Sequence, residues 1–345
     1  MATDLTSLGF TPFFRNQVAV HAGPAARVLA VHRTGLELMG DGLDTLVPLG
    51  GRWYQVPAEE RPTVGDFVVL DEAGESVEAL LERTTLLKRM HPGRPNEVQL
   101  LAANVDLLLV VTSCNEDFNL ARLERYLLLG EESGVPVLVV LTKRDQVDDA
   151  DDLIDQVRTL RAHVDVIALN ALDVEEVRQL EPWCASGQTV VLVGSSGVGK
   201  STLLNALANE ERQRTGAIRE DDAKGRHTTT HRSLHLLPSG LMVVDSPGIR
   251  ELAVVGAEDG VGALFEDIES LAARCRFADC AHHTEPGCAV REAIEAGELD
   301  GRRLESFNKL KREDIVNTES VAERHARMRK FSKTVRYANK VKSKR

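Results

Sequence analysis

A glycine-rich segment in the second half of the chain has the residue types and spacing of a phosphate-binding loop. Residues 194–201 read GSSGVGKS and match the pattern G-x-x-x-x-G-K-[S/T] in full. The glycines let backbone N–H groups turn inward around phosphate oxygens, and the following helix offers its positive N-terminal end. Lys200 can reach the β- and γ-phosphates, and the Ser201 hydroxyl can ligate Mg²⁺. The residues predicted to contact nucleotide here are Gly194, Ser195, Ser196, Gly197, Val198, Gly199, Lys200, Ser201 and Thr202.

Two further segments are predicted to complete the site around Mg²⁺ and the γ-phosphate. Residues 245–248 read DSPG after an apolar run, where Asp245 can hold the magnesium ion and the Gly248 amide can approach the γ-phosphate. Residues 225–230 read GRHTTT and are expected to form a loop carrying a threonine ligand for Mg²⁺. The sequence leaves Thr228, Thr229 and Thr230 open, with Thr229 as the working choice. The predicted catalytic set is Lys200, Thr229, Asp245 and Gly248.

A third motif, TKRD at 142–145, predicts how the base is read. The Asp145 carboxylate can only accept hydrogen bonds, and guanine presents adjacent N1–H and N2–H donors where adenine has an acceptor at N1. A bidentate match of this kind discriminates by about 1–3 kcal/mol. Lys143 can lay its stem over the base and Thr142 can brace the loop. A second base loop is expected at residues 170–171, although it departs from the usual Ser-Ala. The predicted base-site residues are Thr142, Lys143, Arg144, Asp145, Asn170 and Ala171.

The segments that position these motifs alternate between strand and helix patterns. Strands are predicted within 104–113, 135–145, 164–171, 189–193 and 241–245, and helices within 120–134, 151–163 and 200–208. Because the strand segments are apolar throughout, they predict a doubly wound parallel sheet that is buried on both faces.

Residues 27–87 have a different pattern, with short β-rich runs broken by Gly, Pro and Asp. Such runs suggest a small barrel or sandwich, although residues 77–84 would also suit a helix. We therefore expect an N-terminal barrel at 1–95, a nucleotide-binding domain at 96–256 and a C-terminal module at 257–345.

The order of the nucleotide motifs is unusual. The base-reading TKRD precedes the phosphate-binding loop, which in Ras-like GTPases comes first. Moving the termini of a compact domain leaves its sheet and site intact when the chain ends lie close together. The sequence therefore predicts a circularly permuted Ras-like GTPase domain rather than a defective one.

Residues 275–288 hold three cysteines and two histidines. Three Cys and one His can close a tetrahedral structural zinc site, although this spacing is unlike the common finger patterns. The sulfur ligands would be Cys275, Cys280 and Cys288, with His282 or His283 as the fourth ligand. The other two cysteines, at 114 and 184, are expected in the core.

Composition limits the possible locations and partners. The N-terminus lacks the basic start and apolar stretch of a signal peptide, and the longest aliphatic run, at 107–111, is too short to span a bilayer. Five cysteines without a secretion signal favour reduced thiols. A cytoplasmic monomer with no membrane contact is expected.

Residues 302–345 hold 15 Lys and Arg against 5 Asp and Glu, although the whole chain has a net charge of −11. A basic tail on an acidic body suits a nucleic-acid partner or a solvated tail.

Taken together, these motifs resemble the ribosome small-subunit-dependent GTPases of the RsgA (YjeQ) family over almost the whole chain. The resemblance rests on TKRD, GSSGVGKST, GRHTTT, DSPGIRE and CRFADCAHHTEPGCAV in that order. It implies an N-terminal OB-fold, a permuted GTPase domain and a C-terminal helical zinc module in which His282 is the fourth ligand. It also implies late maturation of the small ribosomal subunit, with GTP hydrolysis stimulated by the subunit and with the OB-fold and zinc module gripping ribosomal RNA.

The residue after DSPG predicts a slow enzyme in isolation. Ile249 stands where Ras-like enzymes place the glutamine that orients the attacking water. We expect slow hydrolysis that accelerates on the ribosome; His227 and His231 are candidates for positioning water, or ordinary surface histidines. One alternative is a GTP-binding RNA-assembly switch with negligible turnover. The other is a P-loop enzyme acting on a small molecule, which would leave TKRD and the cysteines unexplained.

Overall fold

The computed structural model describes residues 4–91, 97–161, 163–208, 232–245 and 258–318. The chain divides into two compact units, the first made of residues 1–89 and 99–252 and the second of residues 90–98 and 253–345. Barrel strands and nucleotide-binding strands both belong to the first unit. The three-part division at residues 95 and 256 stays a prediction.

The N-terminal strands form an antiparallel OB-like barrel. Their order in the sheet is β3-β2-β1-β4-β5. The run at 77–84, which also suited a helix, contains strand β5. Inward side chains of these strands make one core around Val28, Leu38 and Val68, with Trp53 packed into it. The strands are β1 (Ala25–Val31), β2 (Leu36–Gly40), β3 (Leu43–Val47), β4 (Phe67–Leu70) and β5 (Val77–Leu80).

The segment at residues 4–18 packs against this barrel. A 3-10 turn at Leu5–Leu8 and helix α1 (Pro12–Val18) bring aromatic rings onto the barrel. The ring centroids of Phe10 and Phe14 lie 5.1 and 4.4 Å from that of Phe67. Packed aromatic rings stabilise a fold beyond the free energy gained by burying their apolar surface. The N-terminal segment is therefore part of the folded unit. Other 3-10 turns are Gly51–Tyr54, Ala58–Glu60, Arg144–Gln146 and Arg178–Leu180.

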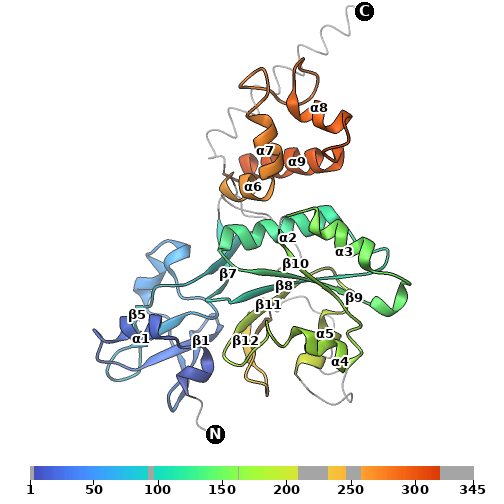
Figure 1. Cartoon of the computed structure of the whole chain (residues 1–345). Coiled ribbons are helices and arrows are strands. Elements are labelled where there is room, and N and C mark those ends of the chain that lie inside the picture. The colour runs from blue at the N-terminus through green and yellow to red at the C-terminus, as the bar shows by residue number, and fades with distance from the viewer. Residues whose placement is uncertain (1–3, 92–96, 162, 209–231, 246–257, 319–345) are drawn as a thin grey trace, which may run out of the picture. The chain divides into compact units, whose positions relative to one another are not determined.

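The predicted parallel sheet is present, with strand order β10-β9-β8-β11-β13. Helices α2 and α3 lie over one face, and α4 and α5 over the other (Figure 1). The strands are β8 (Leu107–Ser113), β9 (Val137–Thr142), β10 (Asp165–Ala168), β11 (Thr189–Val193) and β13 (Met242–Asp245). The helices are α2 (Leu120–Ser133), α3 (Asp151–Arg158), α4 (Val174–Val177) and α5 (Lys200–Leu207).

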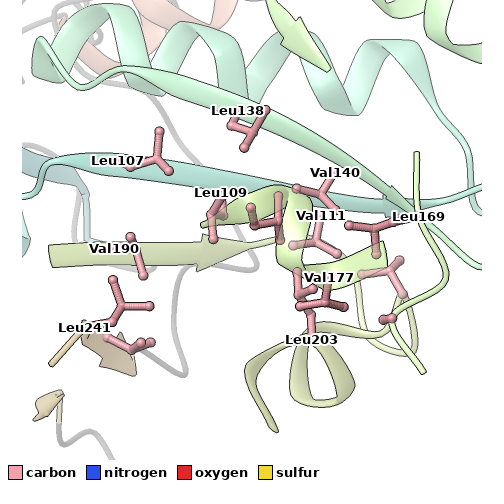
Figure 2. Close-up of a cluster of buried hydrophobic side chains, with 14 residues drawn as sticks. Leu107, Leu109, Val111, Leu138, Val140, Leu169, Val177, Val190, Leu203 and Leu241 are labelled. Atoms are coloured by element: carbon pink, nitrogen blue, oxygen red, sulfur yellow. The ribbon is translucent and has the colours of Figure 1, made fainter. Parts of the chain in front are cut away.

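Burial on both faces explains why these strands read as continuous apolar runs. Leu107, Leu109 and Val111 belong to the core cluster shared with α5 (Figure 2). The alternate residues Leu108 and Val110 point to the opposite face and are also fully buried. Successive side chains of a strand point to opposite faces, so apolar residues are favoured at consecutive positions when both faces are covered.

The barrel and the parallel sheet are joined through an antiparallel strand that the sequence did not predict. Strand β12 (Ser233–Leu236) pairs with β13 along its whole length. It also meets β1 at Ala30↔Ser233, so the hydrogen-bonded sheet runs from the nucleotide-binding strands into the barrel. A separate two-stranded ribbon is formed by β6 (Leu86–Met90) and β7 (Val98–Ala103).

A buried arginine fills this junction. The Arg27 side chain on β1 is 1% exposed. Its Nη2 donates to the Thr189 hydroxyl at 2.8 Å and to the Asn104 carbonyl at 3.2 Å, and its Nη1 lies 3.0 Å from the Met242 sulfur. Burial lowers the pKa of Arg27 to about 10, although the nearby Asp106 carboxylate acts in the opposite direction. The charged side chain therefore ties β1 to the first residues of β11 and β13.

Replacing this arginine should destabilise the first unit. Arg27→Met keeps the side-chain volume but leaves several buried acceptors without a donor, which should cost about 3–5 kcal/mol of unfolding free energy. Urea unfolding followed by tryptophan fluorescence measures the loss, because both tryptophans, Trp53 and Trp183, lie in this unit. The exposed Arg33 is the control, and Arg33→Met should leave the midpoint unchanged. Equal midpoints for the two variants would contradict the role of Arg27.

The second unit is helical over the residues that the structure describes. Arg303 on α9 forms a bidentate ion pair with Asp267 on α7, with nitrogen–oxygen distances of 2.6 and 3.0 Å. The rings of Phe265 and Phe307 pack with centroids 5.5 Å apart. The helices are α6 (Glu258–Leu264), α7 (Glu266–Ala272), α8 (Ala289–Glu295) and α9 (Gly301–Thr318). Across the described parts of both units, each helix is too short or too polar to cross a membrane.

Candidate functional site

The sequence motifs of the first unit meet at one edge of the parallel sheet. The phosphate-binding loop follows β11, TKRD begins at the last residue of β9, residues 170–171 follow β10, and Asp245 is the last residue of β13. All four strands run parallel, so their carboxyl ends lie on the same side. In open α/β sheets this is the edge at which ligands bind.

The phosphate-binding loop has the backbone geometry that its glycines predict. Gly194 has φ +144°, and a Cβ there would lie 2.1 Å from the Val111 carbonyl oxygen. Gly199, the N-cap of α5, has φ +96°. Lys200 Nζ donates to the carbonyl oxygens of Gly194 and Ser195, at 2.8 and 2.5 Å. The lysine head group therefore lies over the first residues of the loop.

The base-reading loop packs directly against the phosphate-binding loop. The buried Thr142 hydroxyl lies 3.0 Å from the Thr112 carbonyl oxygen and within hydrogen-bond distance of the Val198 carbonyl. A Cβ on Gly199 would lie 3.4 Å from the same hydroxyl oxygen. Lys143 has φ +57°, a left-handed conformation that turns the chain sharply before Asp145. Thr142 thus connects the TKRD loop to the phosphate-binding loop.

The second base loop is held by an acidic side chain that sequence reasoning missed. The Asn170 backbone N–H donates to Glu176 on α4 at 2.7 Å, and the Asn170 side-chain oxygen accepts from the Leu172 N–H at 3.0 Å. Ala171 is 7% exposed. The Arg144 N–H donates to the Leu169 carbonyl at 3.3 Å. The two base loops are therefore neighbours, as their predicted roles require.

Helix α2 supplies two contacts to the phosphate-binding loop that the motifs did not reveal. Arg122 Nη1 donates to the Ser195 hydroxyl. One turn further along the helix, burial raises the pKa of the Tyr126 phenol. The positive charge of Arg122 and the Gly194 backbone act in the opposite direction and lower this pKa. The only signal in the sequence was the i, i+4 spacing of these residues after an apolar strand.

The residues predicted to ligate Mg²⁺ fall only partly within the described chain. Ser201, in the first turn of α5, is exposed at the sheet edge. The Asp245 backbone closes β13, beside β11, but its side chain lies outside the described residues. Thr228, Thr229, Thr230, Gly248, Ile249, His227 and His231 also lie outside them. Their predicted roles stay predictions.

In the second unit, the predicted zinc ligands come together. The possible ligand atoms of Cys275, Cys280, His282 and Cys288 all lie within 4.8 Å of one another. Cys275 and Cys288 sulfurs are 3.9 Å apart, and His282 Nδ1 lies 3.7 and 3.4 Å from them. Zn–S bonds of about 2.3 Å at a tetrahedral angle place two sulfurs about 3.8 Å apart. The four side chains therefore fit a structural zinc ion; His283 is not part of the cluster.

Local hydrogen bonds favour the thiolate form of one cysteine in this cluster. Burial raises the pKa of the Cys275 thiol, but the Val290 and Ala289 amides at the start of α8 outweigh it, so the net pKa is lowered. Burial lowers the pKa of His282 and thereby favours the neutral form that binds metals. Glu285, which the sequence reading missed, accepts from the His283 and Thr284 amides at 2.8 and 2.9 Å. It fixes the turn between His282 and Cys288.

Comparisons with known proteins agree with this architecture. The family model of the RsgA GTPase matches residues 80–255. "Small ribosomal subunit biogenesis GTPase RsgA 2" from Vibrio vulnificus is 46% identical over 99% of this chain and 96% of its own length.

Two solved structures have a similar fold. "YjeQ from Thermotoga maritima" has a TM-score of 0.59 and 27% identity, covering 83% of this chain and 96% of its own. "YloQ, a circularly permuted GTPase" has a TM-score of 0.56 and 27% identity, covering 84% and 94%. With a permuted α/β sheet, an OB-like barrel and a clustered Cys₃His set in place, the chain belongs to the RsgA GTPase family.

Proposed function

We propose that this protein hydrolyses GTP during late maturation of the small ribosomal subunit, and that contact with the subunit and its RNA accelerates hydrolysis. The observation that carries the nucleotide part is the direct packing of the TKRD loop on the phosphate-binding loop through Thr142. The ribosomal part rests on the name of the similar protein from Vibrio vulnificus. We place the reaction in the cytoplasm, where ribosomal subunits mature, and expect a monomer.

The proposed nucleotide contacts follow the geometry of the sheet edge. Backbone amides of residues 194–202 would surround the phosphates, and Lys200 would move from the loop carbonyls to the β- and γ-phosphates. Asp145 would accept both hydrogen bonds from guanine, with Lys143 over the base. Residues 170–171 would close the other side of the base. The Gly248 amide would approach the γ-phosphate.

Two metal ions fit the proposal. Ser201, Thr229 and Asp245 would hold Mg²⁺, which neutralises phosphate charge when it is bound with GTP. Cys275, Cys280, His282 and Cys288 would hold one structural Zn²⁺. The support for zinc is the distance set among the four ligand atoms.

The proposed RNA contact depends on charge more than on stacking. Among the aromatic residues expected on the barrel, Trp53 and Phe67 are buried, whereas Tyr54 is 57% exposed. Buried rings are not available to unpaired bases. The basic C-terminal tail, of which residues 319–345 lie outside the described residues, would supply phosphate contacts, and binding should weaken as salt rises.

The test is phosphate release from GTP with and without purified small subunits. We expect slow phosphate release by the protein alone and at least about a tenfold increase with subunits. A partner that orders the catalytic residues can lower the activation free energy by several kcal/mol. Lys200→Ala should remove the stimulated rate. Turnover that stays low in the presence of small subunits would refute subunit-stimulated hydrolysis.

The second candidate is a GTP-binding assembly switch with negligible turnover. Ile249 favours it, because isoleucine cannot orient water. This candidate predicts that the subunit binds the GTP-loaded protein without accelerating phosphate release. The same assay separates the two.

A further inference from the structure

Two cationic side chains converge on one residue of the phosphate-binding loop. Lys200 Nζ donates to the Ser195 carbonyl, and Arg122 Nη1 donates to the Ser195 hydroxyl. The lysine belongs to the loop motif. The arginine comes from α2, 73 positions earlier in the chain, and no motif assigns it a role.

The position of α2 is fixed by the fold on both sides of this contact. Asn119 caps the helix by accepting from the Arg122 N–H at 3.0 Å, so Arg122 lies in the first turn. Strand β8, which leads into α2, pairs with β11, which leads into the phosphate-binding loop. One turn after Arg122, the Tyr126 side chain is buried and holds the helix in the fold. Arg122 itself is half-buried.

The lysine shows on which side of the nucleotide Arg122 lies. Lysines in such loops reach the β- and γ-phosphates, and the Lys200 head group lies at the carbonyls of residues 194 and 195. The first residues of the loop are therefore on the γ-phosphate side. The amides at the start of α5 are at the opposite end of the loop. Since Arg122 is bonded to Ser195, its charge is also on the γ-phosphate side.

We propose that Arg122 is a second phosphate-site cation that contacts the γ-phosphate of bound GTP and so favours the triphosphate over the diphosphate. This inference rests on the proposed function. An arginine supplied near the γ-phosphate, either from the same chain or from a partner, stabilises charge that develops on the transferred phosphoryl group. The position of α2 allows this chain to supply one itself. Such a cation would matter more in this chain because the side chain of Ile249 can neither donate a hydrogen bond nor carry charge.

The experiment measures equilibrium affinities of the full chain for fluorescent GDP and for a fluorescent non-hydrolysable GTP analogue, together with single-turnover GTP hydrolysis. In Arg122→Ala, affinity for the triphosphate analogue should fall about tenfold to 100-fold, the range for one charge-assisted contact, while GDP affinity changes less than about threefold. Hydrolysis should fall by about tenfold or more. Arg122→Lys should recover part of the preference for triphosphate.

A purely structural role for Arg122 predicts a different result. If Arg122 only braces Ser195, its loss should weaken GDP and the triphosphate analogue equally, and that outcome would overturn the inference. Unchanged affinities for both nucleotides would overturn it as well. Arg158 on α3, with a side chain that is 61% exposed, is the control; Arg158→Ala should behave as the wild type. A wild-type chain that binds neither nucleotide would instead refute the proposed function, and this inference with it.

Discussion

In the proposed base site, Asp145→Asn should change the preferred base from guanine to xanthine. GTP affinity should fall by about 100-fold, because a good bidentate pair is worth up to about 3 kcal/mol. Xanthosine triphosphate should gain affinity by a similar factor. This change tests the base assignment through gain of binding as well as loss.

The physical reason is the matching of donors and acceptors. A carboxylate accepts from both N1–H and N2–H of guanine. The amide of asparagine keeps one acceptor and replaces the other with an N–H₂ donor, which would face the N2–H₂ of guanine. Xanthine has N1–H and a carbonyl oxygen at C2, and these match the amide. Asp145 is exposed in the 3-10 turn after β9, so an isosteric change should not disturb the fold.

A neighbouring aspartate provides the matched control. Asp148 is exposed in the same loop, three residues further on, and Asp148→Asn makes the same change in charge. It should bind GTP as the wild type does and show no gain for xanthosine triphosphate. Fluorescence titration with the two triphosphates measures both effects. Loss of GTP binding without gain of xanthosine triphosphate binding would contradict the bidentate contact.

The motifs were predictable from sequence because their chemistry is local. A glycine-rich turn between an apolar strand and a helix has few uses, and GSSGVGKS was predicted correctly as such a turn. The buried strands were recognisable because both faces of the sheet are covered, which removes polar residues from them. The permuted order was visible because each motif follows its own strand. A helix was predicted within 120–134, and Gly134 caps α2 with φ +65°.

Other features depend on contacts between residues far apart in the chain. Arg27 stands between two apolar residues of β1, so alternation predicts a side chain facing solvent. The structure instead buries it where the barrel meets β11 and β13. Arg122 and Ser195 are 73 positions apart, and no local pattern links them. Trp53 illustrates the same limit, since composition could not place its ring in the barrel core.

The permutation changes which elements of the nucleotide-binding sheet are connected directly to the barrel. Because β8 and α2 come first along the chain, they follow directly from the barrel through the ribbon of β6 and β7. Asn104, just before β8, accepts from the Arg27 guanidinium and donates to the Gly65 carbonyl at 3.1 Å. The segment that carries Arg122 to the phosphate-binding loop is therefore anchored on the barrel.

Removing the proposed zinc ion should unfold part of the second unit and leave the first unit intact. Structural zinc contributes about 10–16 kcal/mol of apparent binding free energy in small zinc modules. The loop at 275–288 buries little apolar surface, since Phe277 is 42% exposed and only Cys288 among its sulfur residues is buried. Chelation should therefore free this loop and the start of α8. The Arg303–Asp267 ion pair should retain α7 against α9.

Two probes separate the units in one sample. Tryptophan fluorescence should not change on chelation, because Trp53 and Trp183 both lie in the first unit. Limited trypsin digestion should cut the metal-free chain at Arg276 and Arg291, within the loop and α8, and cut the metal-loaded chain there far more slowly. Cleavage at equal rates in the two forms would contradict a structural role for the metal.

Substituting each of the two adjacent histidines separately tests which of them is the fourth zinc ligand. His282 Nδ1 lies 3.4 Å from the Cys288 sulfur, whereas His283 is exposed and engages Glu285 through its backbone N–H. His282→Asn should lower the zinc content, measured by atomic absorption, from about one ion per chain to well below one, because three ligands no longer close a tetrahedral site. His283→Asn should retain the ion. Loss of zinc in His283→Asn and its retention in His282→Asn would instead make His283 the fourth ligand. That result would require the turn fixed by Glu285 to have a different conformation when zinc is bound.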